Sequence, residues 1–188
     1  MSYPRLVQLI VTAAATFGMA ARAQVTSSES AAFLRKVAGV YKNQFHNSFV
    51  NGEKYESEDI LEVVPIDDLA AYVRMDLEFA NGHSGRIYGV ATYKKNSLVY
   101  DNGKPGDERC IVEYVWSGDA VVTHADYDKT PGCLFYHGAR GTLEGASFSV
   151  KKRQEIRYMD RLRNSREFKE ALSGYRKPDG SNANPRPR

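Results

Sequence analysis

Strict alternation of apolar and polar side chains from Ala70 to Phe79 is the feature that most constrains this chain, because period two is the repeat of a half-buried β-strand. We expect one set of side chains to face a core and the other to face water. The first set is Ala71, Val73, Met75, Leu77 and Phe79; the second is Tyr72, Arg74, Asp76 and Glu78. Asn81-Gly82 then signals a tight turn, and residues Arg86 to Tyr93 are predicted to form the returning strand.

Similar short segments continue on both sides of this predicted hairpin, and turn residues such as Asn51-Gly52 and Asn102-Gly103 separate nearly all of them. The segments are Val40 to Phe45, Ser57 to Val64, Ser97 to Tyr100, Arg109 to Trp116, Ala120 to Ala125, Leu134 to Leu143 and Ala146 to Val150. About eight short strands predict a mainly β fold, a single antiparallel meander that closes into a barrel or folds into a sandwich. We expect the barrel, because closure removes exposed strand edges.

Two helices are predicted to flank the strands. Thr26 and Glu29 have capping-box spacing, and the apolar stretch after them ends at Gly39. A second helix is predicted from Ile156 to Leu172, where the apolar residues form one stripe: Ile156, Met159, Leu162, Phe168 and Leu172. Docking on the outside or across the mouth of the barrel is the simpler role for this amphipathic helix, and contact with a membrane surface is the alternative.

The two ends of the chain are expected to lie outside the folded domain. Residues 1–23 combine an early positive charge, an apolar run of about 15 residues and an A-x-A site ending at Ala23, which together predict a cleaved signal peptide. Residues 174–188 are rich in Gly, Pro, Asn and charge and are predicted to be a disordered tail. We therefore expect one domain over residues 24–173 in a periplasmic or secreted protein that is not an integral membrane protein.

Cys110 and Cys133 are the only cysteines of the chain. Export places them in an oxidising compartment, so we expect a disulfide between them. A metal pair or a reactive thiol is the rival interpretation, but two cysteines without C-x-x-C spacing favour neither.

Catalytic and metal-binding patterns are weak in this sequence. His124, Asp126 and Asp128 alternate as metal ligands would at a strand end, but Pro131 follows closely and no further ligand is adjacent. Ser84 lies in a predicted hairpin turn, and no G-x-S-x-G motif is present. We expect no catalytic set, no metal and no cofactor, and an unrecognised enzyme remains the third hypothesis.

The stretch PGCLFYHGARGTLEGASF, from Pro131 to Phe148, has the glycines of a possible phosphate-binding loop. Their spacing matches neither G-x-G-x-x-G nor the P-loop, and no β-α unit surrounds them. Gly138 and Gly141 are predicted to be bulge or bend positions of a curved strand, with a hairpin closing at Glu144-Gly145. The small residues around Arg140 would let its side chain project toward the carboxylates of a partner.

Charge is unevenly distributed along the chain. Residues 151–188 hold 12 basic and 5 acidic side chains, a net charge of +7, whereas residues 24–150 hold 12 basic and 18 acidic side chains, a net charge of −6. An acidic barrel attracts a basic partner and is a poor nucleic-acid binder. The residues predicted to bind the partner are His83, Arg140, Glu56, Glu58 and Asp59.

Gly39-Val40-Tyr41, which follows the first predicted helix, resembles the G-x-W motif of lipocalins and other calycin-like barrels, with tyrosine in place of tryptophan. The outline of the chain is also similar to that of the small exported barrels that inhibit lysozymes in the periplasm. The resemblance implies a non-enzymatic binding protein, most concretely an inhibitor or immunity protein against a basic cell-wall hydrolase.

The alternative is a lipocalin-like carrier of a small apolar ligand, whose cavity the 12 tyrosines and 8 phenylalanines would line. The barrel interior separates the two hypotheses, because a filled interior favours partner binding and an open cavity favours a carrier.

Overall fold

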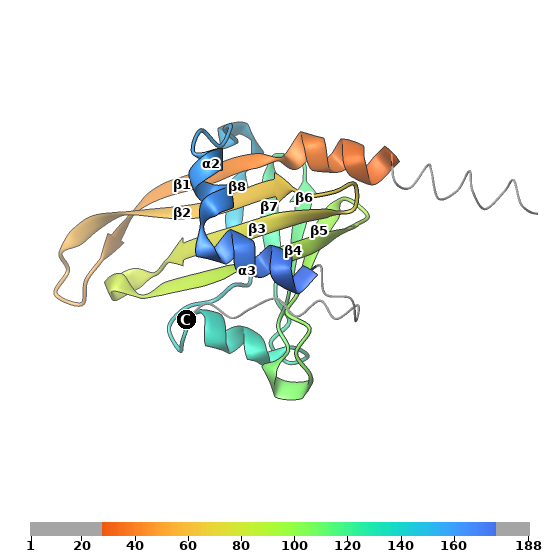
Figure 1. The fold of residues 1–188 in the computed structure, drawn as a ribbon. Helices are drawn as coiled ribbons and strands as arrows, with labels where there is room; N and C mark the ends of the chain where they lie inside the picture. The colour runs from red at the N-terminus through yellow and green to blue at the C-terminus, as the bar shows by residue number, and fades with distance from the viewer. Residues whose placement is uncertain (1–27, 176–188) are drawn as a thin grey trace, which may run out of the picture.

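The computed structural model describes residues 28–175, and its main element is a sheet of eight antiparallel strands that pair in chain order (Figure 1). The strands are β1 (Gly39–Ser48), β2 (Lys54–Pro65), β3 (Ala70–Glu78), β4 (Ser84–Lys94), β5 (Ser97–Asp101), β6 (Ile111–Ser117), β7 (Ala120–His124) and β8 (Ser147–Ser149). A helix over residues 28–37 precedes them. The predicted mainly β meander with flanking helices is confirmed, whereas the predicted signal peptide, Thr26 and most of the predicted tail lie outside the described residues.

The sheet curls into a nearly closed barrel. Val40 of β1 and Gln154, just after β8, exchange two backbone hydrogen bonds of 2.9 Å and so join the first strand to the end of the sheet. The far half of the β1–β2 hairpin projects beyond this point (Figure 1).

Side chains fill the barrel interior. The inward-facing residues of the strands form one continuous cluster in which the largest members are fully buried: Tyr41, Leu61, Met75, Leu77, Ile87, Leu98, Tyr100, Tyr114 and Phe148. Burial raises the pKa of Tyr114 far above its usual value, because the phenolate would lie in an apolar core.

A second apolar layer covers the outer face of the sheet. Tyr72 was predicted to face water, but it is fully buried because Phe168 packs over it with ring centroids 4.8 Å apart. Val64, Ala70 and Tyr88 belong to the same layer. The period of β3 is therefore as predicted, but half of its polar face lies under the C-terminal helices.

The C-terminal helix is broken in two, which corrects the prediction of one helix over Ile156 to Leu172. Helix α2 (Met159–Asn164) ends at Ser165, whose backbone is extended and whose hydroxyl accepts a hydrogen bond from the Phe168 N–H at 3.2 Å. Ser165 thereby caps the N-terminus of the next helix, α3 (Arg166–Tyr175). Serine is a favoured residue at this position, because its side-chain oxygen accepts a backbone N–H of the first turn. Helix α3 also includes Gly174 and Tyr175, which were assigned to the tail.

In residues 28–175 no helix is long and apolar enough to cross a membrane.

The predicted strand from Leu134 to Leu143 is wrong. Residues Pro131–Tyr136 form a 3₁₀ helix, η3, and an irregular loop with Gly138 at φ 67° follows it. The reason is the disulfide between Cys110 and Cys133, which has Cα atoms 4.5 Å apart and confirms the predicted pair. It ties this segment to the start of β6, where it cannot extend the sheet. Gly138 and Gly141 are loop residues and not strand bulges.

Glu62 is a charged residue at the interface between the sheet and the C-terminal segment. It is fully buried, accepts a hydrogen bond of 2.5 Å from the Tyr158 hydroxyl, and lies 3.0 Å from the Arg74 guanidinium. Burial raises the pKa of the Glu62 carboxyl, and the hydrogen bond from Tyr158 and the charge of Arg74 only partly offset this effect.

Replacing both Cys110 and Cys133 by serine is expected to lower the free energy of unfolding by about 3 kcal/mol, because the bond closes a loop of 23 residues in the unfolded chain. Urea unfolding of the variant and of the oxidised wild-type protein measures the difference. Reduced wild-type protein is the control and should match the variant. A loss below about 1 kcal/mol would contradict this role of the disulfide.

Because the folded-state pKa of Glu62 is raised, ionisation of this carboxyl costs more in the folded chain than in the unfolded chain. Its contribution to stability is therefore greatest at low pH and is lost as the pH rises from 4.5, the usual value, through the folded-state pKa. Urea unfolding between pH 4 and pH 8 should show that wild type loses stability relative to Glu62→Gln over this interval. A difference that is constant with pH would refute the assignment.

Candidate functional site

The meander gives the barrel two ends, and one of them carries the disulfide together with His83 and Arg140. We call it the disulfide end; it consists of the connections at residues 49–53, 79–83, 102–110 and 125–146. Alternate turns of a meander lie at the same end, and contacts join these segments in sequence: Val50 to Asn81, Gly141 to Phe79, and Gly132 to Glu108. The turns at residues 66–69, 95–96 and 118–119 lie at the opposite end.

Hydrogen bonds join the first two segments of the disulfide end. The Tyr55 hydroxyl donates to the Phe79 carbonyl at 3.1 Å and accepts from the Gly82 N–H at 2.8 Å. The Val50 N–H donates to Asn81 Oδ1 at 3.4 Å. The tip of the β1–β2 hairpin is therefore fixed to the β3–β4 turn.

Two glycines allow the loop after η3 to contact the same turn. A Cβ atom on Gly85 would lie 2.9 Å from the His137 Cβ, and one on Gly141 would lie 2.3 Å from the Phe79 ring. Both distances are too short for a real side chain, so this approach requires glycine. β5 pairs only with residues 91–94 of β4, and His137, just after η3, packs against Gly85 near the start of that strand.

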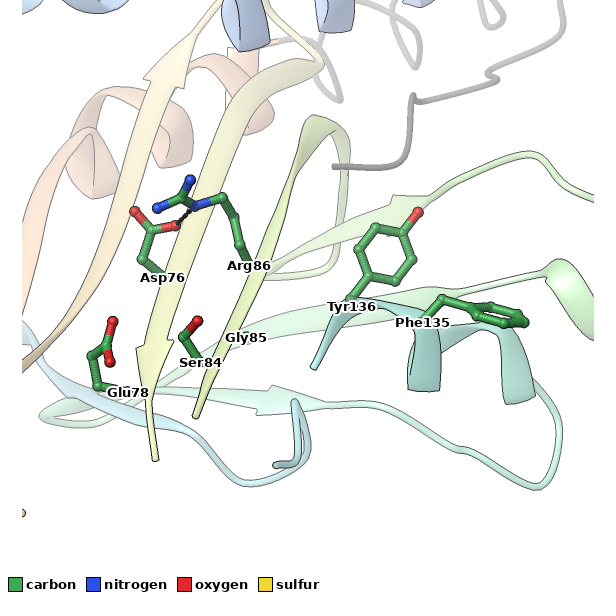
Figure 2. Close-up of a pocket in the computed structure, with 7 residues that line it drawn as sticks. All are labelled: Asp76, Glu78, Ser84, Gly85, Arg86, Phe135 and Tyr136. Atoms are coloured by element: carbon green, nitrogen blue, oxygen red, sulfur yellow. Dashed lines mark hydrogen bonds and ion pairs between the residues drawn. The ribbon is translucent and has the colours of Figure 1, made fainter. Parts of the chain in front are cut away.

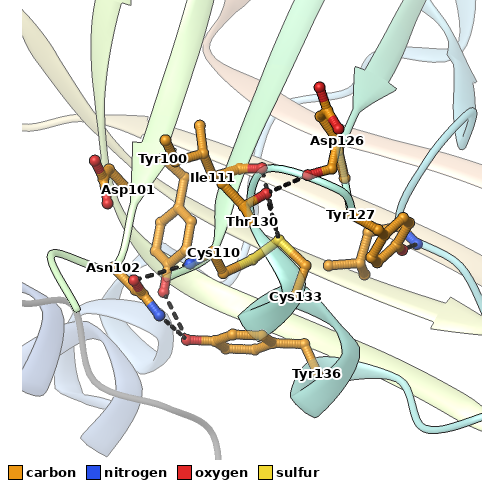
Figure 3. The surroundings of a disulfide bond; sticks show 12 residues. Tyr100, Asp101, Asn102, Cys110, Ile111, Asp126, Tyr127, Thr130, Cys133 and Tyr136 are labelled. Carbon is orange, nitrogen blue, oxygen red and sulfur yellow. Dashed lines mark hydrogen bonds between the residues drawn. A yellow bond between two sulfur atoms is a disulfide. The ribbon is translucent and has the colours of Figure 1, made fainter. Parts of the chain in front are cut away.

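The disulfide that attaches η3 to the barrel is buried, and hydrogen bonds surround it (Figure 3). Beside the disulfide, the Asn102 side chain accepts from the Cys110 N–H at 3.0 Å and donates to the Glu108 carbonyl at 2.9 Å. The Tyr136 hydroxyl at the end of η3 lies 3.2 Å from that of Tyr100 in the barrel core. Both ends of the short helix are thus held by buried contacts.

Most of the exposed large apolar side chains lie at this end, in two separate segments. Among residues 28–175, the exposed large hydrophobic residues are Phe49, Val50, Leu134 and Phe135 at the disulfide end and Leu69 at the opposite end. Phe135 is 62% exposed although η3 is anchored on both sides. Apolar groups held rigidly in water are typical of a surface that binds a protein partner.

The structure separates the predicted acidic residues. Glu56 and Glu58 lie on the outer face of β2, where they pair with His46 at 2.6 Å and Lys42 at 2.5 Å across the β1–β2 ladder. Asp59 points to the other face and accepts a hydrogen bond from the Glu78 N–H at 2.8 Å. Burial raises the pKa of Asp59. The three carboxylates therefore do not form one surface.

His83 and Arg140 lie in two segments that the structure brings together at the disulfide end. His83 is half-buried, and its Nε2 atom is buried without a hydrogen-bond partner among the described residues. Arg140 is exposed, one residue from the Gly141 contact with Phe79.

The weaker chemical candidates have ordinary structural surroundings. His124 pairs with Glu144 at 3.3 Å, and Asp126 pairs with Lys129 at 2.6 Å. Within residues 28–175, no group of three or more His, Cys, Asp or Glu side chains is placed to hold a metal ion. Ser84 lies on the outer face of β4, directly opposite Glu78.

A groove of about 300 Å³ lies beside the exposed aromatic ring of η3 (Figure 2). Its lining residues are Asp76, Glu78, Ser84, Gly85, Arg86, Phe135 and Tyr136. Sequence reasoning missed this groove, because the predicted strand over Leu134 to Leu143 placed Phe135 in a sheet. Of the residues that line the groove, Glu78 could have been identified as a candidate from the sequence, because strand alternation places it on the polar face of β3.

Comparison of the chain with protein families, with curated proteins and with solved structures gives no match in any of the three.

The double substitution Leu134→Ser and Phe135→Ser is expected to change the free energy of unfolding by no more than about 0.5 kcal/mol, because both side chains are exposed. Urea unfolding measures this change, and retention on a hydrophobic column should fall at the same time. Leu98→Ser, in the filled interior, is the control and should destabilise the barrel strongly. A large loss from the double variant would show that η3 is part of the core.

Proposed function

We propose that this chain is a non-enzymatic binding protein that uses the disulfide end to contact a partner protein. The observation that carries the proposal is the exposed pair Leu134 and Phe135 on a 3₁₀ helix locked by the disulfide and by the Tyr100–Tyr136 hydrogen bond. A rigid apolar group loses little conformational entropy on binding and therefore serves as an anchor.

The filled barrel supports this proposal over the carrier hypothesis. Tyr41, Tyr100, Tyr114 and Phe148 occupy the interior and are fully buried. A carrier of a small apolar ligand needs that volume for the ligand. These four aromatic residues, which were considered as part of a cavity lining, belong to the buried core cluster.

Charge supports a basic partner. Residues 24–150 carry a net charge of −6, and the outer face near the disulfide end presents Glu56, Glu58 and Glu78. Long-range attraction to such a surface increases the association rate of a basic protein and weakens with salt.

The most concrete form of the proposal is an exported inhibitor or immunity protein against a basic cell-wall hydrolase. It rests on the leader-like residues 1–23, the acidic barrel and the resemblance to calycin-like barrels and periplasmic lysozyme inhibitors. The helix, eight-strand meander and C-terminal helices agree with that outline. In this proposal η3 and the loop around Arg140 cover the cleft of the hydrolase.

Binding to a panel of purified basic muramidases, measured by calorimetry at low and high salt, tests the proposal. Wild type should bind at least one of them, with lower affinity at high salt. Phe135→Ala should weaken binding by about tenfold or more, because the anchor is lost. Inhibition of cell-wall hydrolysis by the same variants should fall in parallel.

Leu69→Ala is the matched control, since Leu69 is also an exposed large hydrophobic residue but lies at the opposite end of the barrel. It should bind as wild type does. Binding to no member of the panel contradicts the hydrolase assignment. Equal losses from the two alanine variants contradict the use of the disulfide end.

A further inference from the structure

A cavity of about 320 Å³ lies at the end of the barrel opposite the disulfide end, a volume at the lower limit of pockets that hold small molecules. The N-terminal helix over residues 28–37 and the turns at residues 95–96 and 118–119 surround it. The lining residues are Phe33, Lys36, Val37, Asn96, Trp116, Gly118 and Val150. All of them except Val37 are at least partly exposed, so the cavity opens to solvent and is separate from the filled barrel interior.

Hydrogen bonds fix the N-terminal helix against β6 at this cavity. The Trp116 Nε1–H donates to the Tyr41 hydroxyl at 3.2 Å, and that hydroxyl donates to the Val37 carbonyl at 2.7 Å. The rings of Phe33 and Trp116 meet edge to face with their centroids 5.4 Å apart. The cavity is therefore formed before a ligand arrives, and binding costs little conformational entropy.

The apolar part of the cavity suits an aromatic ring. Phe33 and Trp116 are only half-buried, and both line the cavity. A planar ring packed against them would remove apolar surface from water and add the favourable contact between aromatic side chains.

The free polar groups beside these rings are N–H donors. Lys36 lies three residues after Phe33 and so on the same face of the helix, where Cβ atoms are about 5–6 Å apart. Its ammonium forms no ion pair with an acidic side chain of residues 28–175. The side-chain amide of Asn96 is exposed and makes no hydrogen bond in the same part of the chain.

No free acid competes with these donors at the adjacent turn. Asp119 follows the lining residue Gly118, but it is paired with Lys151 at 2.6 Å. The charge left beside the rings is the Lys36 ammonium, which favours an anion. The long lysine side chain lets the ammonium reach a carboxylate on a ring that packs against Phe33.

We propose that this cavity binds a small aromatic carboxylate, whose ring packs against Phe33 and Trp116 and whose carboxylate is bound by Lys36 and Asn96. The site goes beyond the proposed function, because it lies at the opposite end from the partner-binding surface. The two can therefore be tested separately on the same protein.

Trp116 is the single tryptophan of the chain, so its fluorescence reports on the cavity directly. Titration of the oxidised protein with 4-nitrobenzoate, a nitroaromatic quencher, should give quenching that reaches saturation. Random collisions would instead give quenching that rises linearly with concentration. The neutral 4-nitrobenzamide has nearly the same shape and should bind about tenfold more weakly, because it lacks the charge that Lys36 recognises.

Lys36→Gln should weaken binding of 4-nitrobenzoate by about tenfold, because one charge-assisted hydrogen bond is lost. Arg35→Gln is the matched control, since it removes the same charge at the adjacent exposed position, which does not line the cavity, and it should bind as wild type does. Asn96→Gly removes the amide but suits the positive φ of 64° at this position, and it should also weaken binding.

Saturable quenching that Lys36→Gln weakens and Arg35→Gln does not would support the site, even if no muramidase binds the disulfide end. Quenching that is only linear, equal affinity for the carboxylate and the amide, or equal effects of Lys36→Gln and Arg35→Gln would overturn the inference. Unchanged affinity in both Lys36→Gln and Asn96→Gly would overturn it too. None of these results would affect the Phe135→Ala test of partner binding.

Discussion

The close approach of Gly132 to the backbone of Glu108 and Arg109 is the contact on which the disulfide end depends. A Cβ atom at Gly132 would lie 2.2 Å from the Glu108 carbonyl oxygen, so only glycine lets the two segments meet. The adjacent Cys133 can then bond to Cys110, and η3 is fixed beside β6. From there the chain reaches Gly85 and Phe79 and joins the β3–β4 turn.

This arrangement explains why an aromatic side chain remains in water. Tyr136 points inward to the hydroxyl of Tyr100, and Cys133 is also buried, so the residues between them face outward. A helix anchored on one side must expose its other side. Leu134 and Phe135 occupy that side, and the barrel core, already filled by its own side chains, has no room for them.

Much of the fold was predictable because its signals are local. The alternation of β3, the turn at Asn81-Gly82 and the pair of cysteines each required only neighbouring residues or a count. The errors came from contacts between distant segments. Leu134 to Leu143 has a strand-like composition, but the disulfide holds it away from the sheet. Tyr72 is buried because Phe168, far along the chain, covers it.

The candidate site was less predictable than the fold for the same reason. His83 and Arg140 were predicted to bind a partner because they lie in expected loops, and Glu56 and Glu58 because they lie in an acidic stretch. Alternation along β2 places Asp59 on the face opposite to Glu56 and Glu58, and only the ladder register shows that Glu78 stands opposite Ser84. The groove itself needs η3 beside β4, which no short stretch of sequence encodes.

The central claim is that the disulfide end is a rigid framework that holds exposed apolar side chains. Amide hydrogen exchange of the free, oxidised protein tests this claim most directly, through the N–H groups of Cys110, Cys133 and Gly138, which donate to Asn102, Thr130 and Leu134. We predict protection comparable to that of the central strands, while the Leu134 and Phe135 side chains stay accessible to solvent. Exchange of these amides at the rate of an unstructured peptide would contradict the account.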